Sequence, residues 1–128
     1  MIVGFTGTQS GMTDKQKKEL KTLLLAVATE LHHGDCIGAD REAHDIFNNF
    51  ERTVLHLPLN ESKRAFCVVP LENVLPPKPY LDRNHDLVNA CDMLIAAPKT
   101  TKEELRSGTW ATIRYARKIG KYIVILEP

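Results

Sequence analysis

The sequence has 128 residues, the size of one domain that can bury roughly two thirds of its unfolded surface without disulfides. Its 17 basic and 16 acidic side chains leave a net charge of +1, so no strong field recruits polyanions, and double-stranded DNA is a poor candidate partner. Three cysteines without C-x-x-C spacing argue against a disulfide framework, and no apolar run approaches the roughly 20 residues of a membrane span, so we expect a cytoplasmic protein with no membrane partner.

The first part of the chain predicts strands that alternate with helices. The opening run MIVGF predicts a buried strand, and TGTQSG after it predicts a glycine-bearing loop. A helix capped by Thr13 or Asp14 follows, because leucines recur at helical spacing behind it. A brief strand is predicted at residues 31–33, and a second amphipathic helix begins near Ala39 or Asp40.

The second part continues the alternation after an interruption. TVLHL predicts a third strand that Pro58 ends, and the segment from Pro58 to Pro79 carries five prolines and little periodicity. We expect this segment to be a long irregular loop that forms a lid or wall over a site. A short helix in LDRNHDLVNAC, a strand in DMLIAAP, a helix in GTWATIRYARKIG and a last strand in KYIVILEP complete the pattern.

This order of elements predicts the fold class. Strands that alternate with helices favour an α/β fold, with a mostly parallel five-stranded sheet between two layers of helices. With no repeat or low-complexity tract, we expect one domain over residues 1–128, with the proline-rich loop at about 58–79. Ligands of such sheets bind beyond the carboxyl ends of the strands, near the switch in strand order, and the glycine-rich polar stretches all fall on this edge.

Two glycine-bearing loops on that edge are candidate ligand contacts. In TGTQSG, Gly7 and Thr8 offer backbone amides and a hydroxyl that suit an anion or a sugar hydroxyl, although a tight turn explains the same residues. In GDCIGAD, Gly34 and Gly38 permit a close approach of the backbone or a positive φ. Amides near Ala39 would open a helix whose N-terminus favours phosphate.

Two carboxylates in the same stretch are candidate catalytic residues. Asp40 is explained equally well as the N-cap or a first-turn acid of the helix. Asp35 lies before the helix, where a carboxylate can accept hydrogen bonds from ribose hydroxyls or stabilise an oxocarbenium-like centre.

A second helix start supplies further candidates. Ser107, Gly108 and Thr109 open the last helix with unpaired amides aimed at an anion, although capping by Ser107 is the simpler explanation. Arg83 and Asn84 precede the fourth strand, and the guanidinium suits phosphate or carboxylate unless it forms a surface salt bridge.

Metal and cofactor chemistry receive little support. None of the five histidines shows a ligand spacing such as H-E-x-x-H, and Cys36 in its turn is more simply structural than nucleophilic. We therefore expect neither a metal nor a cofactor.

Four segments together resemble the SLOG superfamily of Rossmann-like proteins: TGTQSGMT, HHGDCIGADREAH, DRNHDLVNACDMLIAAP and RSGTWATIRYARKIGKYIVIL. That superfamily includes the Lonely Guy phosphoribohydrolases, the molybdenum-cofactor carrier proteins and the DNA-processing protein A domain. GADREAH is similar to the pattern of glycine, acid and A-H in DNA-processing protein A. SGTW is similar to the G-G-x-G-T element of Lonely Guy enzymes, and Arg83 stands where these families often keep an arginine.

The resemblance implies a Rossmann-like three-layer sandwich with a nucleotide site, phosphate over the start of the Gly108 helix, and a homodimer. It does not carry over catalysis, because Lonely Guy enzymes follow G-T with a glutamate and here Trp110 follows Thr109. We therefore expect a module that binds a nucleotide or nucleotide-derived ligand as a sensor or carrier. One alternative is a nucleoside 5′-monophosphate phosphoribohydrolase that uses Asp35 or Asp40. Single-stranded DNA binding is a second alternative, disfavoured by the near-zero charge and the few aromatic residues.

Overall fold

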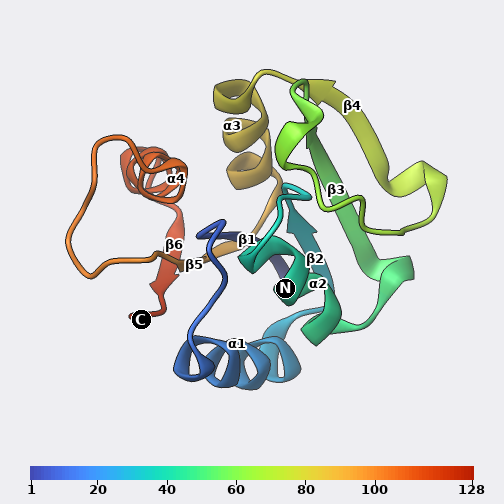
Figure 1. Cartoon of the computed structure of the whole chain (residues 1–128). Coiled ribbons are helices and arrows are strands. Elements are labelled where there is room, and N and C mark those ends of the chain that lie inside the picture. The colour runs from blue at the N-terminus through green and yellow to red at the C-terminus, as the bar shows by residue number, and fades with distance from the viewer.

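The computed structural model describes residues 1–128 as one six-stranded sheet with helices on both faces (Figure 1). The strand order is β4-β3-β2-β1-β5-β6, and every neighbouring pair is parallel. None of the helices combines the length and apolar character that crossing a membrane requires. The elements are β1 (Ile2–Gly7), α1 (Asp14–Val27), β2 (Glu30–His33), α2 (Ala39–Phe47), β3 (Thr53–Pro58), β4 (Val74–Lys78), α3 (Tyr80–Ala90), β5 (Met93–Ala97), α4 (Gly108–Lys118) and β6 (Tyr122–Ile125).

Strand β5 shows how the sheet separates the two helical layers. Side chains on a strand alternate between its faces, and Ile95 packs in the core cluster that contains residues of α1 and α2. Leu94 packs instead with Val88 of α3 and Ala116 of α4. Because both faces are covered, all five residues of β5 are buried, which is typical of a central parallel strand.

The helices begin where the sequence predicts them. Thr13 caps α1, and its side chain and that of Gln16 form a capping box. Helix α2 begins at Ala39, and Ser107 caps α4 with its side-chain oxygen. The starts of α1 and α4 are fixed by short-range hydrogen bonds, so local sequence is sufficient to locate them, whereas Gly38 before α2 makes no side-chain capping bond.

The prediction of five strands and of a wholly irregular proline-rich loop is wrong at one place. Residues Val74–Lys78 form β4, which pairs with β3 at the edge of the sheet. Pro76 and Pro77 donate no hydrogen bond, so their presence indicates loop in the sequence. The nitrogens of two consecutive residues point to opposite sides of a strand, so the edge position accommodates one proline, and the irregular register between His56 and Pro58 accommodates the other.

The strand order reverses between β1 and β5, and the glycine-bearing loops meet beside this switch. Gly38, the N-cap of α2, has a φ of +82°, and a Cβ at this position would overlap the carbonyl oxygen of Gln9. The Ala39 amide donates a 3.0 Å hydrogen bond to the Thr8 carbonyl oxygen. The loops after β1 and β2 are therefore packed backbone to backbone.

This contact predicts unequal effects of alanine at two glycines. Gly120 has a similar φ of +75°, but a Cβ there would meet nothing within 4 Å. Gly120→Ala should lower the free energy of unfolding by about 1 kcal/mol through backbone strain. Gly38→Ala should lower it by about 2 kcal/mol more, because the methyl group displaces the Gln9 backbone. Urea denaturation of both variants measures the difference, and equal losses would show that the two loops are not in contact.

Candidate functional site

A cleft of about 520 Å³ opens at the switch in strand order. It lies at the carboxyl end of β1, between the loop that follows β2, the start of α3 and the start of α4. The structure brings nine of the twelve sequence-predicted site residues together in its lining: Gly7, Thr8, Gly34, Asp40, Arg83, Asn84, Ser107, Gly108 and Thr109.

Three predicted residues, Asp35, Gly38 and Ala39, do not line the cleft. Gly38 and Ala39 form the contact between loops described above, and the Ala39 amide is used by Thr8. The anion contact expected at that amide is thus replaced by a hydrogen bond within the chain. The sequence does not show this, because the acceptor belongs to a loop about thirty residues earlier.

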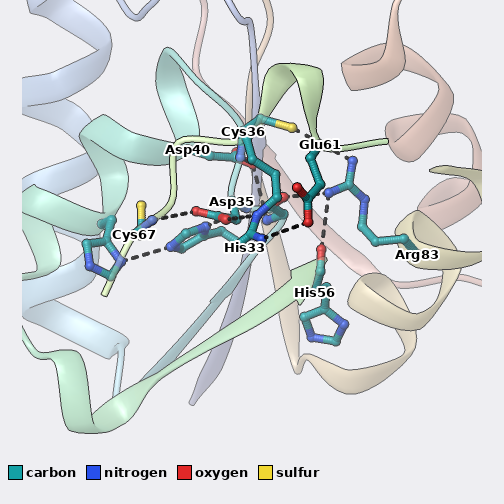
Figure 2. A network of polar contacts seen from close by, with 11 residues as sticks. His33, Asp35, Cys36, Asp40, His56, Glu61, Cys67 and Arg83 are labelled. Carbon is teal, nitrogen blue, oxygen red and sulfur yellow. Dashed lines mark hydrogen bonds and ion pairs between the residues drawn. The ribbon is translucent and has the colours of Figure 1, made fainter. Parts of the chain in front are cut away.

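Asp35 is buried, with no exposed surface, and both of its carboxylate oxygens are engaged. Oδ2 accepts a 2.7 Å hydrogen bond from Nε of Arg64, and Oδ1 accepts a 2.8 Å bond from the amide of Cys67. Figure 2 shows the carboxylate beside Cys67 rather than beside Arg83. Asp35, with a φ of +55°, thus anchors the 64–67 segment and does not line the cleft.

Asp40 is the predicted carboxylate that does line the cleft. Its Oδ2 accepts hydrogen bonds from the amides of Gly34, at 3.1 Å, and Cys36, at 3.2 Å, while Oδ1 has no partner in the chain. Burial raises the pKa of Asp40 to about 6, although Arg83 and the two amides oppose the rise. A carboxyl with this pKa can accept a ligand hydroxyl or exchange a proton near neutral pH.

Arg83 is 6% exposed and is held by oxygen atoms. Nη1 donates to the carbonyl oxygens of Gly34 at 2.6 Å and His56 at 3.1 Å, and Nε donates to Oδ1 of Asn84 at 2.8 Å (Figure 2). The contact of Nη2 is a 3.8 Å approach to Sγ of Cys36. Nη2 is therefore the part of a fixed guanidinium that remains available to a ligand oxygen.

This arrangement explains why residue 34 is glycine. A Cβ on Gly34 would overlap Nη1 of Arg83 and come within 3.2 Å of Oδ2 of Asp40. The close approach predicted for this glycine is made by a side chain of the protein itself.

The first turn of α4 is open to the cleft. Oγ of Ser107 accepts from the Trp110 amide at 3.2 Å, and the first main-chain bond of the helix joins the Ala111 amide to the Ser107 carbonyl oxygen. The amides of Gly108 and Thr109 precede this bond and have no intrahelical acceptor. A Cβ on Gly108 would meet nothing within 4 Å, and both Gly108 and Thr109 line the cleft.

Sequence reasoning missed several cleft residues. Tyr80 begins α3, and the Arg83 guanidinium carbon lies 5.3 Å from its ring centre. Three exposed charged residues come from the polar loop after β5, and the position of that loop at a strand end is the signal that could have identified them. The missed residues are Phe5, Thr6, Gln9, Cys36, Tyr80, Leu87, Lys99, Glu104 and Arg106.

Behind the cleft, His33, His44 and Cys67 bring potential metal-binding atoms within 4.8 Å of one another. The Asp35 amide donates to Nδ1 of His33 at 3.0 Å, so the ring hydrogen lies on Nε2, which faces Nδ1 of His44 at 3.0 Å. Burial lowers the pKa of both histidines, which keeps them neutral. Their lone pairs are therefore engaged by hydrogen bonds, and the arrangement suits a structural cluster better than a cation.

The raised pKa of Asp40 predicts a pH-dependent effect of its substitution. The folded state binds the carboxyl proton more tightly than the unfolded chain, so this stabilisation is complete below pH 3.8 and is lost as the pH rises through about 6. The free energy of unfolding of Asp40→Asn, relative to wild type, should therefore rise by about 2 to 3 kcal/mol between pH 4 and pH 7. Urea unfolding of both proteins measures this difference, in which the shared histidine contributions cancel. A difference that does not change with pH would contradict the assignment.

No family model matches the sequence, and no curated protein matches it. Solved structures do match. DNA processing protein A from Helicobacter pylori, described by its single-stranded DNA binding mode, has a TM-score of 0.68 and 19% identity over 98% of this chain. The molybdenum cofactor binding protein from the phototrophic bacterium Rippkaea orientalis has a TM-score of 0.71 and 22% identity over 97% of this chain. The structural genomics target TM1055 has a TM-score of 0.67 and 16% identity over 95%.

The chain spans 64% of the DNA processing protein A chain, 74% of the molybdenum cofactor binding protein and 71% of TM1055. The TM-scores establish a common fold. The sequence identities are too low to transfer ligands or activities to this chain. The match extends over nearly the whole of this chain. The chain therefore has the Rossmann-like fold of these structures, as its sequence motifs predict.

Proposed function

We propose that the protein binds a nucleotide or nucleotide-derived small molecule in the cleft and serves as a sensor, a carrier or another binding module. The observation that carries this proposal is the convergence on one cleft of three polar features that retain hydrogen-bonding capacity. These are the first-turn amides of α4 at Gly108 and Thr109, Nη2 of Arg83, and Oδ1 of Asp40. Amides and a guanidinium suit phosphate oxygens, and a carboxylate oxygen suits a sugar hydroxyl.

The size and charge of the cleft favour a small ligand over a polymer. A volume of about 520 Å³ lies within the range of small-molecule sites. Three basic residues, Arg83, Lys99 and Arg106, face two acidic ones, Asp40 and Glu104. This small positive excess suits a ligand with one or two phosphate charges, which we place over the Gly108 helix start. The solved structures of this fold bind different ligands by their descriptions, so they support a binding module without selecting its ligand.

The enzymatic alternative would now depend on Asp40. Both oxygens of Asp35 are engaged outside the cleft, whereas Asp40 has an unpartnered oxygen and a pKa raised to about 6. Hydrolysis of a nucleoside monophosphate adds water across the N-glycosidic bond and releases free base and ribose 5-phosphate. Cytoplasmic location and a homodimer stay predictions from the sequence.

Filling the space above the α4 amides tests the proposal. Gly108→Leu should weaken binding of a nucleoside 5′-monophosphate at least about tenfold, because the side chain occupies the phosphate position and removes several contacts. Its thermal stability should equal that of wild type, since a Cβ there meets no atom. Lys118→Leu adds the same side chain at the exposed far end of α4 and should bind as wild type does. Calorimetric titration of a nucleotide panel provides the affinities.

The same panel separates the alternatives when free and retained molecules are analysed by mass spectrometry. An unmodified nucleotide retained by wild type supports the binding module. Free base with ribose 5-phosphate, lost in Asp40→Asn, would identify an enzyme instead. Binding of oligonucleotides alone, with a steep salt dependence, would indicate a single-stranded DNA protein. Equal nucleotide affinities of wild type and Gly108→Leu would contradict the proposed phosphate position.

A further inference from the structure

A row of three polar side chains joins β2 to β3 on the face of the sheet away from His33. Oε1 of Glu30 lies 2.8 Å from Nε2 of His32, and Nδ1 of His32 lies 2.8 Å from Nε2 of His56. His32 is 7% exposed and His56 is 3% exposed, while Glu30 is partly open to solvent. A buried row of polar side chains is unfavourable unless each polar atom has a hydrogen-bond partner. The atom at the end of the row therefore indicates where a partner is missing.

Hydrogen accounting relates the two ends of the row. A Glu30 carboxylate only accepts, so Nε2 of His32 donates to it. When His32 carries that ring hydrogen alone, its Nδ1 accepts, which places the ring hydrogen of His56 on Nε2. Nδ1 of His56 is then left with a lone pair, makes no hydrogen bond within the chain and keeps some accessible surface.

That lone pair belongs to a second pocket, of about 270 Å³, between β3, β4 and α3. Leu57, Leu75 and Pro76 give it an apolar wall, and the ion pair of Lys78 with Asp86, 2.5 Å apart, lies at its more exposed side. Figure 2 shows the His56 ring turned away from its own carbonyl oxygen, which Arg83 binds. The ring therefore serves this pocket and not the cleft described above.

We propose that this pocket is a second binding site, for a small, mainly apolar molecule with one hydroxyl or N–H donor that bonds to Nδ1 of His56. Burial and the neighbouring His32 lower the pKa of His56 to about 3, so the ring stays neutral and Nδ1 stays an acceptor at physiological pH. The charged groups that face it are Arg83, Lys78 and Asp86, and the last two already neutralise each other. A neutral donor matches this environment better than an ion.

Phenol and anisole provide matched probes, because they have similar size and only phenol carries a donor. In isotope-labelled protein, phenol should shift the signals of His56 and Leu75 saturably and bind about fivefold more tightly than anisole, the factor of one net hydrogen bond. The ¹⁵N shifts of the free protein should show His56 protonated on Nε2. Equal binding of the two probes, no saturable shift at the pocket, or a His56 protonated on Nδ1 would each overturn the proposal.

A substitution at the far end of the row separates the hydrogen-bond argument from simple filling of the pocket. Glu30→Gln leaves the pocket lining unchanged, but its amide can donate to His32 and so release the tautomer of His56. The ratio of the phenol affinity to the anisole affinity should then fall towards one. Glu51→Gln, an exposed residue outside the row, should keep it. An undiminished preference in Glu30→Gln would show that the row does not set the acceptor. Neither variant alters the nucleotide cleft, so the outcome is independent of the proposed function.

Discussion

Arg83 carries a positive charge that is almost completely buried, and the chain satisfies it with main-chain and amide oxygens. These bonds tie α3 to the end of β2 at Gly34 and to the end of β3 at His56. They also require a glycine at position 34 and give the guanidinium one fixed orientation. Arg83 lines both the cleft and the second pocket.

Asp35 and Asp40 show how packing separates two acids that the sequence presents as equivalent. Asp35 is turned towards Arg64 and Cys67 and holds a loop. Asp40 accepts from the amides at the mouth of its own loop and keeps one oxygen for the cleft. The difference arises because the 64–67 segment, distant in the sequence, pairs with the residues beside Asp35. Both oxygens of one acid are held by the chain as a result, and the other acid keeps an unpartnered oxygen in the lining of the cleft.

Buried polar side chains are arranged differently on the two faces of β2. His33 faces α2 and bonds to His44, whereas His32 faces the α3 side and bonds to His56. The first pair closes on itself and stabilises the wall behind the cleft. The second ends in an unpartnered nitrogen in a pocket. Adjacent histidines in a strand thus serve separate structures, because neighbouring side chains point to opposite faces.

The sequence by itself determined the alternation of strands and helices, the helix starts at Thr13 and Ser107, and the edge on which the polar loops gather. Each depends on short-range periodicity, on capping, or on the rule that parallel strands end at one edge. Only the tertiary structure decided that Val74–Lys78 is a strand, because an edge position with an irregular register makes its two consecutive prolines acceptable. It also decided which acid reaches the cleft and that the guanidinium of Arg83 is buried, since the partners of these charges come from segments far apart in the chain.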